Sequence, residues 1–203
     1  MKTNANTRKR LPAEERRRQI LASAVKIFAR SNFQSARVAD IAADVGVSEA
    51  AVYKYFPTKK AIYLEVLKHM SDRIIEFWQA EKDKAPDAIQ AMRNMGMIYY
   101  RRMVRRPAAL KVQFQAIAEV DDPDIARQLH QDHERYLEFI AGVIQQGIDQ
   151  GLIRPDVRPE TLAWIFNGVG INMNMMMILS FRKQFDEAVV TSITDHLLAS
   201  IKA

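Results

Sequence analysis

The sequence contains no cysteine, only seven glycines and seven prolines in 203 residues, and no uninterrupted apolar run that could span a bilayer. The missing cysteine excludes disulfides, a thiolate nucleophile and cysteine-ligated zinc or iron–sulfur sites. The scarcity of glycine and proline, between long stretches of good helix formers, favours helix almost throughout. The first residues also lack the apolar segment of a secretory signal, so we expect no signal peptide.

The residues that are present indicate a folded protein, since 48% are hydrophobic and 27% are charged. The most apolar segment, 164–181, is interrupted by Asn167, Asn172 and Asn174, whose amides would need partners inside lipid. We therefore expect a buried helix here, and no membrane partner.

The positive charge is concentrated in the first third of the chain. Residues 1–66 carry 13 basic and 6 acidic side chains, a net charge of +7, whereas residues 67–203 carry 17 and 18, a net charge of −1. A positive field confined to one segment suggests an anionic partner, either nucleic acid or a membrane surface. An arginine-rich, well-solvated surface is the alternative.

Apolar residues recur at helical spacing, and strand-like alternation is absent from the sequence. Several prolines stand where a helix would begin, because the first turn does not need the missing N–H. The pattern predicts nine or so helices, over residues 13–30, 38–45, 49–55, 59–82, 86–105, 107–119, 123–150, 159–181 and 184–201.

The stretch 38–56 (VADIAADVGVSEAAVYKYF) has the most specific pattern. Ala42 lets two short helices approach closely, Gly46 suits the positive φ of a tight turn, and Ser48 can cap the next helix. This spacing is typical of a helix-turn-helix unit, whose second helix enters the DNA major groove. An ordinary helical hairpin is the alternative, but the motif lies in the basic segment and the outward side chains of its second helix are small or polar (Glu49, Ala50, Tyr53 and Lys54).

At these residues the chain resembles the tetracycline-repressor (TetR) family of transcriptional regulators. The resemblance covers residues 14–67, and it is most specific at the Val-Tyr-x-Tyr-Phe-x-x-Lys pattern that closes with Lys59. Farther along, only the helix count and the stretch IDQGLIRPDVRPETLAWIFNG are similar. The family often has threonine at the start of its second helix, where this chain has Ala36 and Arg37.

The resemblance implies an all-α protein with an N-terminal three-helix helix-turn-helix DNA-binding domain and a C-terminal helical ligand-binding and dimerisation domain. We expect a flexible basic arm over residues 1–12, the DNA-binding domain over 13–58 and the second domain over 59–203. The implied function is a cytoplasmic regulator, most often a repressor, that binds palindromic operator DNA as a homodimer. A small, largely apolar effector would release it, and neither enzyme activity nor a cofactor or metal is expected.

The resemblance also implies roles on DNA. Ala50 and Ala51 would lie at the floor of the major groove, which leaves Ser48 and Lys54 as the polar readers of base edges. Phosphates would be contacted by Arg37, Tyr53, Tyr55 and Lys59. Solvent exposure or half-buried packing is the alternative for each of them. The basic residues 8–10 would follow the DNA or form a disordered tail.

The last two predicted helices carry apolar rows that fit a dimer interface or a monomer core. One row comprises Val189, Ile193, Leu197 and Ile201, and the other comprises Trp164, Phe166, Val169 and Ile171. By resemblance we expect a homodimer here.

The remaining helices, dense in methionine, are expected to enclose an effector cavity or simply to form a core. The candidate wall residues are Tyr100, Met103, Gln113, Phe114, Trp164, Asn167 and Met173.

The segment 130–134 (HQDHE) raises one alternative to a DNA-binding regulator, a metal-binding enzyme. His130 lies one helical turn from His133 and Glu134, which is workable two-point metal geometry. A metal-binding enzyme would need further ligands, which the sequence does not indicate, so we interpret this segment as a polar stripe on an exposed helix face. A helical adaptor that binds protein alone is the other alternative.

Overall fold

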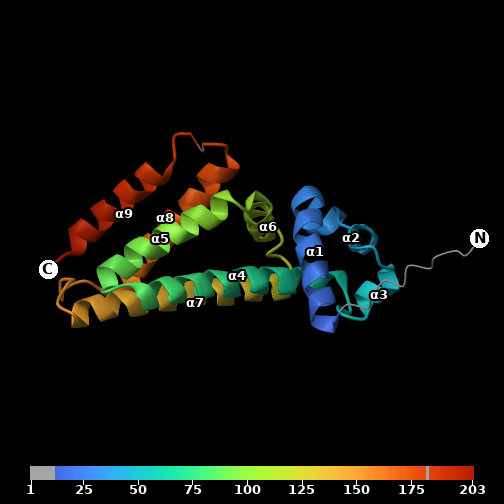
Figure 1. Ribbon diagram of the computed structural model, residues 1–203, viewed down its shortest axis with the longest axis horizontal. Helices are drawn as coiled ribbons and strands as arrows, with labels where there is room; N and C mark the ends of the chain where they lie inside the picture. Colours follow the sequence, from blue (N-terminus) through green and yellow to red (C-terminus); the bar gives the residue numbers. More distant parts are fainter. Residues whose placement is uncertain (1–11, 182) are drawn as a thin grey trace, which may run out of the picture. The chain divides into compact units, whose positions relative to one another are not determined.

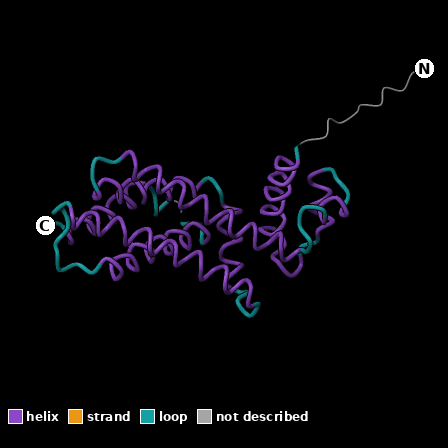
Figure 2. The backbone as a smooth tube through the Cα atoms, turned by 90° about the horizontal axis from the view of Figure 1, so that it is seen from below, coloured by secondary structure: helices purple, strands orange, loops and turns teal. Residues whose placement is uncertain are grey.

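The structure is a computed structural model that describes residues 12–181 and 183–203, and these residues form nine α-helices joined by short turns (Figures 1 and 2). Within them, extended backbone pairs at one isolated bridge, between Ile153 and Lys202. The prediction of an all-α fold is therefore confirmed. The helices are α1 (Ala13–Ser35), α2 (Val38–Val45), α3 (Glu49–Tyr53), α4 (Lys59–Lys84), α5 (Ala88–Val104), α6 (Pro107–Ile117), α7 (Pro123–Asp149), α8 (Pro159–Ile178) and α9 (Glu187–Ile201).

The chain divides into two compact units, with the boundary between Val66 and Leu67 inside α4. The first unit comprises α1, α2, α3 and the beginning of α4, and the second comprises the rest of α4 with α5 to α9. The basic arm was predicted over residues 1–12, and residues 1–11 of it, the basic residues 8–10 included, lie outside the described residues.

The first unit has a small aromatic core. The ring centroid of Tyr63 lies 4.8 Å from that of Phe28 and 4.7 Å from that of Phe33, and all three side chains are buried. Asn32 interrupts α1 with φ 59° and ψ 176°, and one further turn extends the helix to Ser35 beyond this kink. The Asn32 side chain accepts a hydrogen bond from the Ser35 N–H at 3.0 Å, which stabilises that turn.

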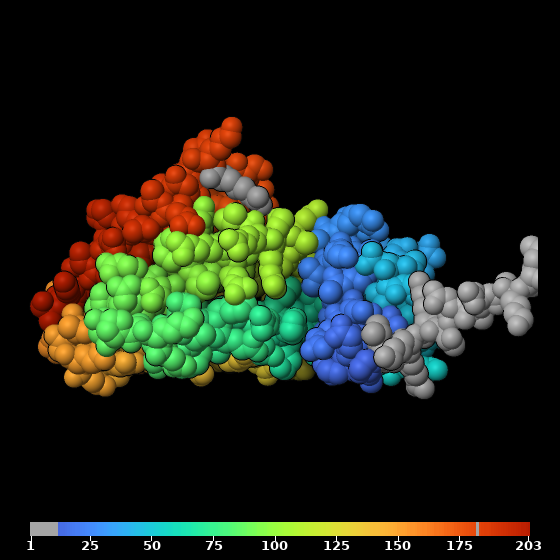
Figure 3. All heavy atoms as spheres, viewed as in Figure 1, coloured from blue at the N-terminus to red at the C-terminus, as the bar shows by residue number. Residues whose placement is uncertain are grey.

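The second unit is a bundle in which α7 packs mainly on α8, and α9 on α5. Figures 1 and 3 show α9, in red, running beside the green α5. Two ion pairs join these two helices: Arg93 to Asp195 at 2.7 Å and Arg101 to Glu187 at 2.9 Å. The buried core between the helices includes Trp78, which stacks edge-on against Tyr136 at 5.5 Å.

Candidate functional site

The turn between α2 and α3 has the geometry that the sequence predicts. Gly46 has φ 73° and ψ 39°, and the N–H groups of Gly46 and Val47 return to carbonyls at the end of α2. Ser48 occupies the N-cap of α3, and its hydroxyl accepts the Ala51 N–H at 3.2 Å. Beneath the turn, Ile41, Ala42 and Val52 are buried, so both short helices are fixed to one core. The two predictions for Gly46 and Ser48 are confirmed.

Val52 anchors α3, and the opposite face of the helix is left open. Along this helix and just beyond it, Ser48, Glu49, Ala50, Tyr53 and Lys54 are exposed. Ala51 and Tyr55 are half-buried at the edge of the same face. The outer surface of α3 therefore has small alanine side chains at its centre and polar side chains around them.

Tyr53 keeps its proton at neutral pH. Partial desolvation and the neighbouring Glu49 carboxylate raise the pKa of this phenol above its usual value. A protonated hydroxyl on an exposed helix face can donate a hydrogen bond to a phosphate oxygen.

Lys59 has a structural role that sequence reasoning missed. Its Nζ donates to the carbonyl oxygens of Gln34 at 3.0 Å and Ala36 at 3.1 Å, and lies 4.9 Å from the centroid of the Phe33 ring. The ammonium therefore ties the end of α1 to the start of α4. Two of its three donors serve these carbonyls, and one remains for another acceptor.

We expect Lys59→Ala to destabilise the protein by about 1 to 3 kcal/mol, because two carbonyl oxygens lose a charged donor. Urea denaturation of the full chain at fixed protein concentration measures this loss. Lys54→Ala, at an exposed position of the same unit, is the control, with an expected change below about 0.5 kcal/mol. Equal stability of the two variants would contradict the structural role of Lys59.

Arg37 stands at the N-cap of α2, where no side chain caps the first turn. Its own side chain is exposed. Free helix N–H groups and a guanidinium at one end of a helix form a suitable environment for an anion.

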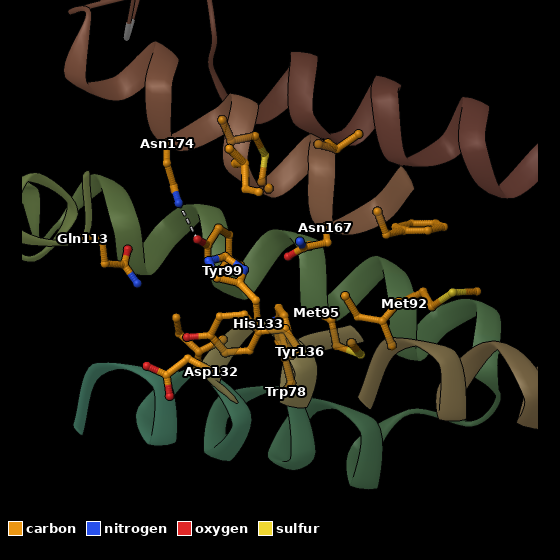
Figure 4. Close-up of a pocket in the computed structure, with 18 of the residues that line it drawn as sticks. Trp78, Met92, Met95, Tyr99, Gln113, Asp132, His133, Tyr136, Asn167 and Asn174 are labelled. Atoms are coloured by element: carbon orange, nitrogen blue, oxygen red, sulfur yellow. Dashed lines mark hydrogen bonds between the residues drawn. The ribbon is translucent and has the colours of Figure 1, made fainter. Parts of the chain in front are cut away.

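The second unit contains a partly open cavity of about 150 Å³, which is lined by residues of α4 to α9 (Figure 4). The structure brings four predicted wall residues to it: Gln113, Phe114, Asn167 and Met173.

The other three predicted wall residues lie elsewhere. Tyr100 and Met103 pack in a separate core cluster, where the Tyr100 hydroxyl donates to the carbonyl of Phe185 at 3.1 Å. Trp164 is 63% exposed. For Tyr100 the reason is helical rotation, since Tyr99 takes the cavity-facing position of α5 and its neighbour Tyr100 points away.

Two polar residues of the cavity wall were not predicted to lie there. Asp132 and His133 line it from α7, although the sequence suggested an exposed stripe there. Asp132 is only 5% exposed and accepts a hydrogen bond from the Gln128 side chain at 3.0 Å. One pattern in the sequence indicates that Asp132 is buried, because it stands in an apolar series at helical spacing. The series comprises Ile125, Leu129, Asp132, Tyr136 and Ile140.

Burial is the main cause of the pKa shifts of the titratable groups on the cavity wall. It raises the pKa of the Asp132 carboxyl to about 6 and lowers the pKa of His133. It also raises the pKa of Tyr99 to about 12, although the Asn174 amide donates to that hydroxyl at 2.6 Å. At neutral pH the wall therefore carries a carboxylate, a neutral imidazole and neutral phenols.

The carboxylate of Asp132 is expected to destabilise the fold at neutral pH. Its folded-state pKa lies above the value near 4 of an unfolded chain, so the penalty is present above about pH 6 and disappears as the pH falls toward 4. We expect Asp132→Asn to raise the free energy of unfolding by about 1 to 2 kcal/mol at pH 7.5. Denaturation at several pH values measures the difference, which should shrink below pH 6. A less stable variant at pH 7.5 would contradict this prediction.

The opposite side of α7 carries the remaining members of the possible metal cluster. His130 Nε2 lies 3.1 Å from Glu134 Oε1, and both side chains are exposed. In the described part of the chain, no group of three or more histidine or acidic side chains could hold a metal ion.

One face of α8 is apolar and exposed. Its members recur at helical spacing and comprise Trp164, Ile165, Ile171, Met175 and Ile178, and exposed Leu179 follows at the C-cap. The predicted α9 row differs from this face, because Ile201 is buried and Val189, Ile193 and Leu197 are half-buried. Phe166 and Val169 are also half-buried, and they pack on the cores of the second unit.

None of the described helices is both long and apolar enough to cross a bilayer.

The chain matches known regulators over most of its length. Residues 20–66 match the family described as bacterial regulatory proteins, tetR family, and residues 112–193 match a tetracyclin repressor-like C-terminal domain. The transcriptional regulator LuxR of Vibrio harveyi is 27% identical over 162 residues, which cover 80% of this chain and 78% of LuxR.

Two solved structures illustrate the similarity of fold. The regulator FadR from Bacillus subtilis, in complex with stearoyl-CoA, has a TM-score of 0.76 at 16% identity, covering 90% of this chain and 95% of FadR. A transcriptional regulator from Saccharomonospora viridis, in complex with choline, has a TM-score of 0.72 at 25% identity, covering 94% and 99%. The protein therefore belongs to the tetracycline-repressor family of bacterial transcriptional regulators, whose members bind DNA and small-molecule effectors and are not enzymes.

Proposed function

We propose that the protein is a cytoplasmic repressor that binds palindromic operator DNA as a homodimer and is released by a small effector. The observation that carries this proposal is the α2–α3 unit, in which buried Val52 fixes α3 while its outer face stays open. A single unit of this size reads few base pairs, and two copies related by a two-fold axis match a palindrome. In functional terms, we assign DNA binding to residues 13–58, and effector binding and dimerisation to 59–203.

On DNA, we assign Ala50 and Ala51 to the floor of the major groove, where a methyl group can meet a thymine methyl. Ser48 and Lys54 would read base edges. The phosphates would be bound by Arg37, Tyr53, Tyr55 and Lys59.

The exposed apolar face of α8 supports homodimerisation. Apolar side chains that line one face of a helix favour a partner surface over water. Homodimers are typical of this family. We place the interface on the last two helices, with α8 contributing most of its apolar surface.

Release follows from thermodynamic linkage. An effector that prefers a conformation with a different separation of the two reading heads weakens DNA binding by the same factor by which DNA weakens effector binding. The helix α4 belongs to both units of the chain and is the natural element to carry this change.

The test is to select genomic DNA fragments with the purified full-length protein and to measure affinity for them at several salt concentrations. We expect binding that weakens steeply with salt. Tyr53→Phe and Lys59→Ala should each weaken binding to every duplex, and Lys59→Ala should lower the salt slope by about one per subunit. An unchanged slope would contradict the phosphate role of Lys59, and no salt-sensitive DNA binding would contradict the proposal.

A further inference from the structure

The charges on the cavity wall are of one sign. Asp132 is the one carboxylate, and neither lysine nor arginine contributes among the described lining residues. We propose that the effector is a small organic cation, with an apolar body the size of one ring and a nitrogen that pairs with Asp132. This inference rests on the proposed function, because it names the chemical class of the ligand that releases the regulator.

The Asp132 carboxylate is incompletely neutralised by its own protein. The nearest cation is Arg135, whose Nη1 lies 3.8 Å away, whereas its Nη2 lies 2.7 Å from Asp72 of α4. A buried carboxylate whose counter-ion is shared with a second carboxylate is only partly compensated, and a bound cation would relieve the remaining penalty. An anionic ligand would place a second negative charge in the same desolvated space.

Aromatic side chains make up much of the wall of the same cavity. Trp78 lies 6.1 Å from Tyr99 and 5.5 Å from Tyr136, measured between ring centroids, and Phe114 completes the aromatic lining on α6. Aromatic rings attract cations through their quadrupole, and the attraction increases when water is excluded.

Unpaired polar atoms on the wall indicate where a ligand could form hydrogen bonds. Gln113 Oε1 and Asn174 Oδ1 are buried acceptors without a partner, and the Asn174 amide nitrogen is already bonded to Tyr99. Trp78 Nε1 is a buried donor without a partner. These three atoms suit a ligand that offers N–H donors to the two oxygen atoms and one acceptor atom to the indole N–H. Figure 4 shows Gln113 and Asp132 toward one end of the cavity and Met92 toward the other, with Asn167 between them.

The volume limits the apolar body. A cavity of about 150 Å³ holds a molecule near the size of benzene. A single ring with a short nitrogen-bearing arm fits this space.

The test uses three probes of one shape: protonated 2-phenylethylamine, neutral 2-phenylethanol and anionic phenylacetate. Titration calorimetry of the full-length protein at pH 7.5 should show the amine binding at least about tenfold more tightly than the alcohol, and phenylacetate binding weakest. Asp132→Asn should remove most of the preference for the amine over the alcohol. The matched control is Glu134→Gln, a carboxyl-to-amide change on the exposed side of α7 that should preserve the preference.

Equal or tighter binding of phenylacetate, an unchanged preference in Asp132→Asn, or no binding of any probe up to about 10 mM would each overturn the cationic class. DNA binding, measured in parallel on selected fragments, separates this result from the proposed function. If the protein binds DNA but prefers the anion, the inference fails and the regulator remains. If it binds no DNA, the proposed function fails whatever the probes do.

Discussion

Ala50→Glu is expected to weaken binding to operator DNA by at least about a hundredfold. Ala50 lies on the open face of α3, where a longer side chain meets water in the free protein. In the complex its carboxylate would stand at the groove floor, among base acceptors and between two phosphate backbones. A homodimer would carry two such charges, so the repulsion acts at both half-sites.

The free fold should tolerate this change, since a glutamate in the first turn of a helix interacts favourably with the helix dipole. Affinity is measured by fluorescence anisotropy on a selected duplex. The control is Ala80→Glu, which makes the same change of charge at an exposed alanine of α4. If both variants bind as the parent does, α3 is not the reading helix.

The second large effect concerns the exposed face of α8. We expect the double variant Trp164→Asp, Met175→Asp to be monomeric at micromolar concentration, because two charges would be buried in an apolar interface. Operator affinity should also fall by about a hundredfold or more, since two half-sites are no longer bound by one linked particle.

Analytical ultracentrifugation measures the first effect and anisotropy the second. Val120→Asp is the control, because Val120 is also an exposed apolar residue, at 46%, but lies after α6 and outside the last two helices. It should remain dimeric. A dimer of unchanged affinity in the double variant would exclude α8 from the interface.

Local signals in the sequence were sufficient for much of the fold. Pro107, Pro123 and Pro159 occupy the first positions of three helices, as predicted, because proline lacks the N–H that a first turn leaves unpaired. The predicted start of α9 was wrong by three residues. There Asp186 caps the helix by accepting the N–H groups of Ala188 and Val189, a side-chain signal that the apolar pattern did not reveal.

The residues of the candidate sites also fall into those that local sequence predicts and those that it does not. The conformation at Gly46 and Ser48 follows from neighbours in sequence and was predicted. The bonds from Lys59 to carbonyls at the end of α1 join segments more than twenty residues apart, and no local pattern encodes them. The side of α7 that faces the cavity was encoded by its apolar spacing, but the polar character of Asp132 masked it.

The most direct test of the account is a hydroxyl-radical footprint of the full-length protein on a selected DNA fragment. We expect two protected blocks related by a two-fold axis, with centres about one helical turn or a multiple of it apart, and loss of both with Ala50→Glu. A single unsymmetrical block, or the same footprint with Ala50→Glu, would contradict the claim that a homodimer reads DNA through α3.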